Sequence, residues 1–204
     1  KPDEVFREVA AETKLLQIYN QLESVAAPAF LVDQFKGGYL ATEYLIKKGH
    51  TKIAHFSGAN VLDCHGIQRL AGYKKALVDN GIDPSTQLVA ETGYAWESGY
   101  EAAKVLLNQP YFKRPTALFA TADMVAWGAI KYFRQNGLKV PEDIAVVGYD
   151  NLYIADKIDP PLTTISQPKE QLGKIAMDSL LRAIEGEPIS SMLFEPELIV
   201  RNSV

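Results

Sequence analysis

The chain has 204 residues, of which 47% are hydrophobic and 23% are charged, the balance of a globular protein with one large domain or two small ones. A formal net charge of −4 argues against a large basic surface for nucleic acid within this segment. No apolar run reaches the roughly 18 residues that a membrane span needs, and the opening residues do not form a signal peptide. Together with a single cysteine, Cys64, these features predict a cytoplasmic protein with no membrane partner.

Short apolar runs alternate along the chain with amphipathic stretches of about a dozen residues. We expect helical spacing over 1–24 and helices at 37–48, 69–80, 97–108, 124–136 and 170–185. We expect strands at 29–32, 53–56, 88–91, 117–120, 144–147 and 198–200. Such alternation with short loops specifies a doubly wound parallel sheet of the α/β class.

The segment from Val146 to Asn151 is the strongest candidate for a ligand clamp. The buried strand expected at 144–147 is bounded by Gly148, and Tyr149 and Asp150 follow that glycine. Ligands of open α/β sheets bind just outside the carboxyl ends of the strands, where a carboxylate can accept two hydroxyl or N–H donors.

An ordered set of motifs carries a family resemblance. The motifs are Val146–Asn151, Pro160–Pro168, the box Arg69-Leu70-Ala71-Gly72-Tyr73, and the final segment Pro196–Val204. Together they resemble the effector-binding domain of the LacI/GalR family of bacterial transcription regulators. The resemblance implies a periplasmic-binding-protein type I fold: two doubly wound lobes crossed three times by the chain, with the effector between them.

Carried onto this sequence, the resemblance assigns residues 1–58 and 166–195 to an amino-terminal lobe, and residues 59–165 and 196–204 to a carboxyl-terminal lobe. The family has further strand and helix units before the segment that matches 30–33. We therefore expect an incomplete amino-terminal lobe, and a DNA-binding helix-turn-helix that is absent from this chain.

Three charged residues match effector contacts of the family. Arg69 opens a helix, and its planar guanidinium can grip a carboxylate, vicinal hydroxyls or a purine edge. Asp150 matches the effector-binding aspartate. Asp123 either caps the helix that follows it or faces the ligand. Ala122 stands where the family commonly has asparagine, which weakens a simple transfer of galactoside-like recognition.

Five further residues are candidate ligand contacts. Tyr94 aligns with an aromatic residue that stacks on the effector, and Trp96 replaces it if the alignment shifts by two. Gln167 resembles a glutamine at the pocket edge, and Asp63 and His65 lie in the loop before Arg69, where family members vary their specificity residues. For each of these, core packing or a solvated loop is the alternative role.

The sequence predicts neither a catalytic residue nor a metal site nor a cofactor. Cys64 and His65 are neighbours but form no triad, and His50 and His55 have no third metal ligand. No phosphate-binding glycine loop and no nucleophile elbow occurs, which argues against a dehydrogenase or a hydrolase.

The predicted function is an effector-sensing and dimerisation domain of a LacI-type regulator, with a periplasmic sugar-binding protein as the alternative. The expected partners are a small-molecule effector, a second copy of the chain in a homodimer, and operator DNA bound through an amino-terminal domain not present here. The effector is expected to be a sugar or a sugar derivative, with purines as the second candidate.

Overall fold

The computed structural model describes residues 2–58, 64–110 and 114–204, which divide into two compact units. Unit 1 comprises the chain up to Asp33 together with Gln167–Pro196, and unit 2 comprises Gln34–Ser166 and Glu197–Val204. The expected first crossing near Gly58 is wrong, because the chain leaves unit 1 after Asp33. The reason is that strand β3 (Ile53–Ser57) lies inside the sheet of unit 2, between two other strands.

Within the described residues, unit 2 is built on a six-stranded sheet in the order β4-β3-β5-β6-β7-β9. Its other strands are β4 (Val89–Glu91), β5 (Ala117–Ala120), β6 (Ala145–Asp150), β7 (Thr163–Ser166) and β9 (Glu197–Ile199). Its helices are α2 (Gln34–Lys47), α3 (Cys64–Asp79), α4 (Trp96–Leu107) and α5 (Asp123–Gln135), with single 3-10 turns at Pro84–Thr86 and Tyr153–Asp156. The predicted parallel sheet is confirmed for five strands, whereas β9 pairs antiparallel with β7.

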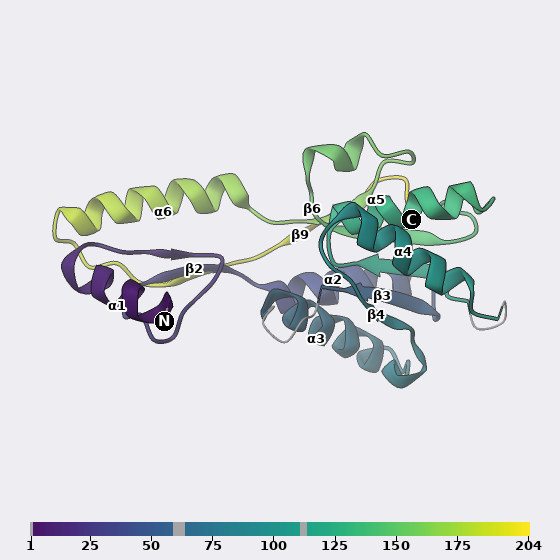
Figure 1. Ribbon diagram of the computed structural model, residues 1–204, viewed down its shortest axis with the longest axis horizontal. Coiled ribbons are helices and arrows are strands. Elements are labelled where there is room, and N and C mark those ends of the chain that lie inside the picture. The colour runs from purple at the N-terminus through teal and green to yellow at the C-terminus, as the bar shows by residue number, and fades with distance from the viewer. Residues whose placement is uncertain (1, 59–63, 111–113) are drawn as a thin grey trace. The chain divides into compact units, whose positions relative to one another are not determined.

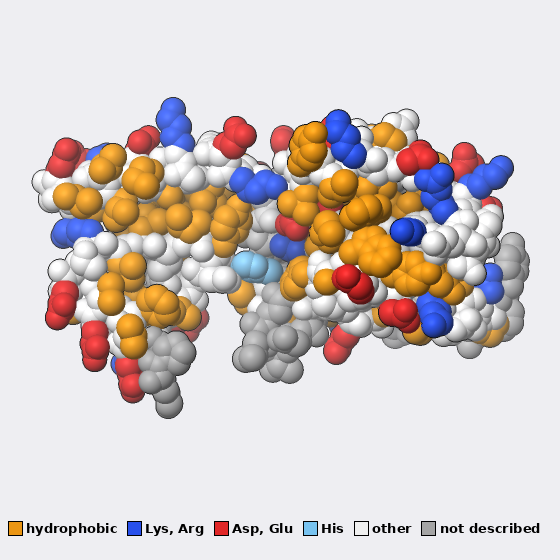
Figure 2. All heavy atoms as spheres, turned by 45° about the horizontal axis from the view of Figure 1, so that its top comes forward, with side chains coloured by type: hydrophobic (Ala, Val, Ile, Leu, Met, Phe, Trp, Pro, Cys, Tyr) orange, Lys and Arg blue, Asp and Glu red, His pale blue; other side chains and the backbone are white. Residues whose placement is uncertain are grey.

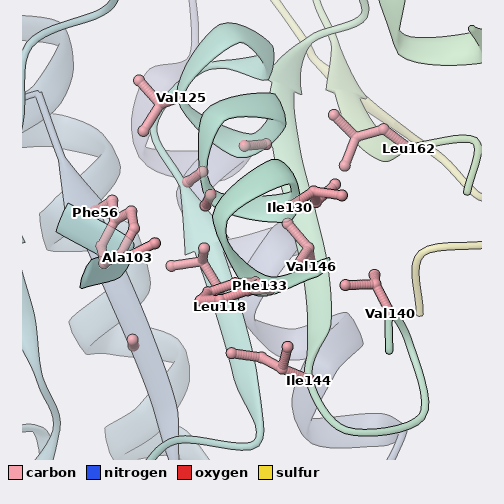
Figure 3. Packing of buried hydrophobic residues seen from close by; sticks show 14 of the residues in the cluster. Phe56, Ala103, Leu118, Val125, Ile130, Phe133, Val140, Ile144, Val146 and Leu162 are labelled. Carbon is pink, nitrogen blue, oxygen red and sulfur yellow. The ribbon is translucent and has the colours of Figure 1, made fainter. Parts of the chain in front are cut away.

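Helices cover both faces of this sheet, so the strands β3, β5 and β6 at its centre are buried on both sides and mostly apolar. Along β5, Leu118 points into a cluster with α4 and α5, and Phe119 points into a second cluster with α2 and α3. Figure 3 shows the first cluster, in which Phe133 of α5 packs against Leu118 and Val146. This two-sided burial explains why short apolar runs predicted the positions of the central strands.

Glycines allow the helices of each face to touch. A Cβ atom on Gly38 of α2 would lie 2.1 Å from the carbonyl oxygen of Arg69, and one on Gly72 of α3 would lie 2.0 Å from the carbonyl oxygen of Phe35. These distances are far below van der Waals contact, so only glycine permits this crossing. The same crossing therefore fixes the backbone of Arg69 against α2.

Unit 1 contains a small parallel sheet in the order β1-β2-β8 among the residues described (Figure 1). Its elements are α1 (Pro2–Glu12), β1 (Gln17–Ile18), β2 (Ala29–Val32), α6 (Lys169–Ile184) and β8 (Met192–Phe194). Helix α6 buries Leu172 and Ala176 against Phe30 of β2, while Met177 and Leu181 remain exposed. Among the described residues, no helix has the length and apolar character needed to cross a bilayer.

Candidate functional site

The side chain of Arg69 is the centre of a polar group at the carboxyl ends of the strands of unit 2. It is only 4% exposed, which is unusual for arginine. Its Nε donates to Oε1 of Gln34 at 2.9 Å, and its Nη1 donates to the carbonyl oxygen of Thr121 at 2.6 Å. Its guanidinium carbon lies 3.7 Å from the centre of the Tyr149 ring, a cation–π contact. The arginine is thus held rigidly.

Asp150 lies at the last position of β6 in a backbone conformation that few residues adopt. Its φ is +104° and that of Asn151 is +47°. Asn151 is held by Arg201, whose Nη2 donates to Oδ1 of Asn151 at 2.7 Å. The expected strand over 144–147 is longer than predicted, because Asp150 pairs in register with Ser166 of β7. Backbone strain of this kind persists where the surroundings enforce it, often at functional sites.

Arg69 and Asp150 face each other across a gap that suits a bridging group. Nη2 of Arg69 lies 3.9 Å from Oδ1 of Asp150, which is too long for a hydrogen bond. The side chain of Asp150 is 23% exposed and so remains accessible. A hydroxyl group can accept a bond from the guanidinium and donate one to the carboxylate, whereas a group that only donates or only accepts cannot do both.

Asp123 supports the turn after β6. It is fully buried, and its Oδ2 accepts from the backbone N–H of Leu152 at 2.7 Å, while its Oδ1 accepts from the hydroxyl of Thr164 at 2.5 Å. The capping prediction is wrong, because Ala122 occupies the N-cap and Asp123 is the first helical residue. A ligand could reach this carboxylate only by displacing its partners, so the geometry favours a positioning role.

Tyr94 lies at the same edge of the sheet, directly after β4. Its ring lies against Gly58 at the end of β3: a Cβ atom on Gly58 would be 2.5 Å from the Tyr94 hydroxyl. The residue is 43% exposed, so part of the ring is open to a ligand. Tyr94 lines a pocket together with Ser98 and Ala102 of α4, and its stacking on an effector stays a prediction.

Trp96 lies in a different environment from the one predicted. It stacks on Tyr100 with ring centres 5.3 Å apart and meets the edge of Trp127 at 6.2 Å. These residues belong to α4 and α5, on the face of the sheet opposite α3 and Arg69. The structure therefore places Trp96 in an aromatic cluster on the α4–α5 layer. Figure 2 shows hydrophobic side chains gathered on the surface of this part of unit 2.

The remaining predicted contacts divide among three places. His65 is half-buried one helical turn before Arg69, on the same side of α3. Gln167 is nearly buried and belongs to unit 1, not to the unit that carries Arg69. Asp63 lies outside the described residues.

Three residues that position the arginine were not predicted from sequence. Gln34 is 1% exposed, and its Oε1 also accepts from the Tyr149 hydroxyl at 2.9 Å. Thr121 supplies a carbonyl, and Tyr149 supplies a ring face. Thr121 directly follows β5 of the same sheet, so the rule that pointed to Asp150 could have found it, whereas Gln34 follows a strand of the other sheet.

Beneath the arginine, His55 of β3 is a neutral core residue. Its ring is fully buried between Tyr73 and Phe119, with ring centres 5.0 Å and 4.6 Å away. Nδ1 lies 3.0 Å from the carbonyl oxygen of Phe119 and must donate to it, so Nε2 carries the lone pair. Burial lowers the pKa of His55 to about 4, and the charge of Arg69 also lowers it. In the part of the chain that the structure describes, no three His, Cys, Asp or Glu side chains are grouped as metal ligands.

Comparison with known proteins places the chain in a family. Residues 42–204 match the model of the periplasmic binding protein-like domain. The chain is 40% identical over 185 residues to the HTH-type transcriptional repressor PurR of Vibrio campbellii, covering 89% of this chain and 54% of that protein. It is 38% identical over 180 residues to the ribose operon repressor of Haemophilus influenzae, covering 87% of this chain and 53% of that protein. The chain thus spans about half the length of the curated relatives it matches.

A solved structure of a LacI family transcriptional regulator from Enterococcus faecium, with bound ribose, superposes on 98% of the chain and 83% of its own length. The TM-score is 0.85 at 25% sequence identity. The two α/β units, the buried arginine of α3 and the aspartate that ends β6 agree with these likenesses. The chain belongs to the periplasmic binding protein-like family, as an effector-binding domain of the LacI/GalR type.

Proposed function

We propose that this domain binds a neutral polyhydroxy compound, a sugar, at the strand ends of unit 2, and that binding controls a LacI-type repressor. The observation that carries the proposal is the 3.9 Å gap between Arg69 Nη2 and Asp150 Oδ1, which a ligand hydroxyl can bridge. The opposite charges of these two residues cancel, so they do not favour a strongly anionic ligand. The ribose held by the Enterococcus faecium regulator supports the sugar class.

Control of DNA binding is proposed for the longer protein. The relatives of about twice this length are named as HTH-type and operon repressors, so operator DNA would be bound by a segment outside this chain, in the cytoplasm. A ligand shifts a conformational equilibrium only by its unequal affinity for the two conformations.

The effector class and the role of Asp150 can be tested together by thermal unfolding with ribose, other mono- and disaccharides, sugar phosphates and purine bases. A ligand present at 100 times its dissociation constant should stabilise the wild-type protein by about 2.7 kcal/mol. The substitution Asp150→Asn keeps the side-chain shape, and asparagine tolerates positive φ better than alanine does. We expect it to abolish the shift, because an amide carries no negative charge for the ligand hydroxyl.

The matched control is Asp156→Asn, a change in an exposed aspartate shortly after the site. It should leave the ligand-induced shift intact. Equal shifts in wild type and Asp150→Asn would contradict the proposed site. A shift with purine bases alone would favour the second candidate ligand, for which the part-exposed Tyr94 ring offers a stacking surface.

We also propose that unit 2 forms a homodimer through the aromatic cluster of Trp96, Tyr100, Trp127 and Tyr132. These rings lie side by side on α4 and α5, and Lys131 Nζ lies 5.2 Å from the centre of the Trp96 ring. Tryptophan and tyrosine are enriched at the centres of protein interfaces.

Sedimentation equilibrium should show that Trp127→Ala weakens dimerisation by about 10-fold or more, the effect of a central tryptophan. Val78→Ala, on the exposed side of α3, should not weaken it.

A further inference from the structure

Two buried hydroxyl groups at the ends of neighbouring strands lack hydrogen-bond partners within the described ranges 2–58, 64–110 and 114–204. Ser57 ends β3 and Thr121 follows β5, and both residues are fully buried. Neither Ser57 Oγ nor Thr121 Oγ1 has a hydrogen-bond partner among the residues that the structure describes. Because nearly all buried polar groups in folded proteins are hydrogen-bonded, two such groups side by side require an explanation.

Strand register places the two hydroxyls together, on the side of the sheet that carries Arg69. Phe56 pairs with Ala120, and the backbone N–H of Thr121 donates to the carbonyl oxygen of Phe56 at 2.9 Å, so Ser57 and Thr121 are neighbours. Ile53 and Phe119 point into the cluster formed with α2 and α3. Side chains alternate along a strand, so Ser57 and Thr121 point to that same side.

Arg69 lies over this row of side chains. Its Nη1 binds the Thr121 carbonyl, and its guanidinium lies on Tyr149, the next residue in the row. Nη2 of Arg69 makes no hydrogen bond to any residue that the structure describes, and its nearest acidic group is the Asp150 oxygen at 3.9 Å. Two hydroxyls and one guanidinium nitrogen on this side of the sheet therefore have hydrogen-bonding capacity that the described residues do not use.

We propose that the Ser57 and Thr121 hydroxyls, with Arg69 Nη2, form a subsite that binds one hydroxyl group of the effector and helps to determine which sugar is recognised. The inference rests on the proposed function. An alcohol oxygen can accept from Arg69 and from one protein hydroxyl while its own proton goes to a second acceptor. Sites built to hydrogen-bond a ligand hydroxyl reject analogues that lack it, because the buried protein groups are then left unpaired.

The test uses calorimetric titration of the chain with D-ribose and with deoxyribose analogues that each lack one hydroxyl. Thr121→Val preserves the side-chain shape, and Ser57→Ala removes the second hydroxyl. We expect each variant to bind ribose about 10-fold more weakly or worse, as loss of a buried hydrogen bond implies. One deoxyribose should bind the wild type and Thr121→Val equally, which identifies the hydroxyl that the subsite holds.

Thermal unfolding separates this role from a structural one. Because the Thr121 hydroxyl has no partner among the described residues, Thr121→Val should be at least as stable as the wild type. Thr51→Val, on an exposed residue before β3, is the matched control and should change neither quantity. Wild-type affinity in both variants would overturn the subsite, as would a loss of stability without a loss of affinity.

The outcome also distinguishes the two proposals. If Asp150→Asn abolishes ribose binding while Ser57→Ala and Thr121→Val retain it, only the hydroxyl subsite is overturned. If the wild-type protein binds neither ribose nor any other sugar of the panel, the proposed function fails, and the subsite fails with it.

Discussion

Replacing Arg69 with methionine is expected to abolish effector binding and to destabilise unit 2 by about 2–4 kcal/mol, the range for losing a buried, hydrogen-bonded charged group. The side chain is 4% exposed and donates to Gln34 and to the Thr121 carbonyl. Methionine fills much of the same volume but leaves the carbonyl of Thr121 without its donor. Ligand affinity should fall by at least about 100-fold, since a charged hydrogen-bonding group contributes roughly 3 kcal/mol.

Arg69→Lys separates charge from shape. Lysine keeps the positive charge but cannot reproduce the planar fork that contacts Gln34, Thr121 and the Tyr149 ring together. We expect intermediate stability and weak binding. Urea-induced unfolding followed by circular dichroism measures the first quantity, and calorimetric titration measures the second.

Arg134→Met is the matched control for the methionine variant. Arg134 lies on α5 of the same unit and pairs with Asp159 at 2.7 Å, but its side chain is 51% exposed. Exposed ion pairs contribute about 0–1 kcal/mol, so this variant should remain close to the wild type and should bind ligand normally. If Arg69→Met were as stable as Arg134→Met and bound ligand equally well, Arg69 would not be the centre of the site.

The sequence predicted the central strands better than the edges of the sheets. Ala29–Val32 and Ala117–Ala120 were located correctly, because strands buried on both faces are short continuous apolar runs. Strand β7, after two prolines and with polar threonines, was missed because its pairing with β6 joins distant segments. Strands β1 and β8 were missed because they have only two and three residues, too few to show a pattern, and their pairing with β2 defines them.

The prediction that the chain first crosses between the lobes near Gly58 is wrong for a related reason. A glycine after a strand marks a turn but does not reveal which sheet the strand enters. Ile53–Ser57 joins β5 through register pairs that begin at Ile53 and Ala117, a partner more than sixty residues away along the chain. Only that pairing shows that residues 34–58 belong to unit 2.

For the site, sequence patterns indicated the charged residues but not their supports. Arg69 and Asp150 occur in recognisable motifs, and the structure brings them together. Gln34 was overlooked because nothing in sequence shows that the start of α2 meets α3. That contact depends on Gly38 and Gly72, which let the two helices approach closely.

Lowering the pH from about 6.5 to about 4 is expected to destabilise the protein through His55 by roughly 3 kcal/mol, at 1.36 kcal/mol per pKa unit. Burial between Tyr73 and Phe119 lowers the pKa of His55 to about 4 in the folded state, from about 6.5 when unfolded. Between these values the unfolded chain binds a proton that the folded protein excludes, so stability falls as the pH falls. Well above pH 6.5 the residue is neutral in both states and has no such effect.

The measurement is the free energy of unfolding in urea at several pH values between 7 and 4, for the wild type and for His55→Asn. Asparagine can still donate to the Phe119 carbonyl but does not titrate. Other groups, such as carboxylates, affect both proteins alike, so the difference between the two isolates His55. The stability advantage of the wild type over the variant should shrink steadily as the pH falls.

His50→Asn is the control for this effect. Burial also lowers the pKa of His50, but its ring is only partly buried and lies near the surface beside Thr116. The pH dependence that it removes should therefore be smaller than that removed by His55→Asn. Parallel pH profiles for the wild type and His55→Asn would mean that the ring accepts a proton inside the folded core. In that case a hydrogen-bond acceptor would have to reach the protonated Nε2 of His55, and a neutral His55 ring between Tyr73 and Phe119 would not describe the protein in solution.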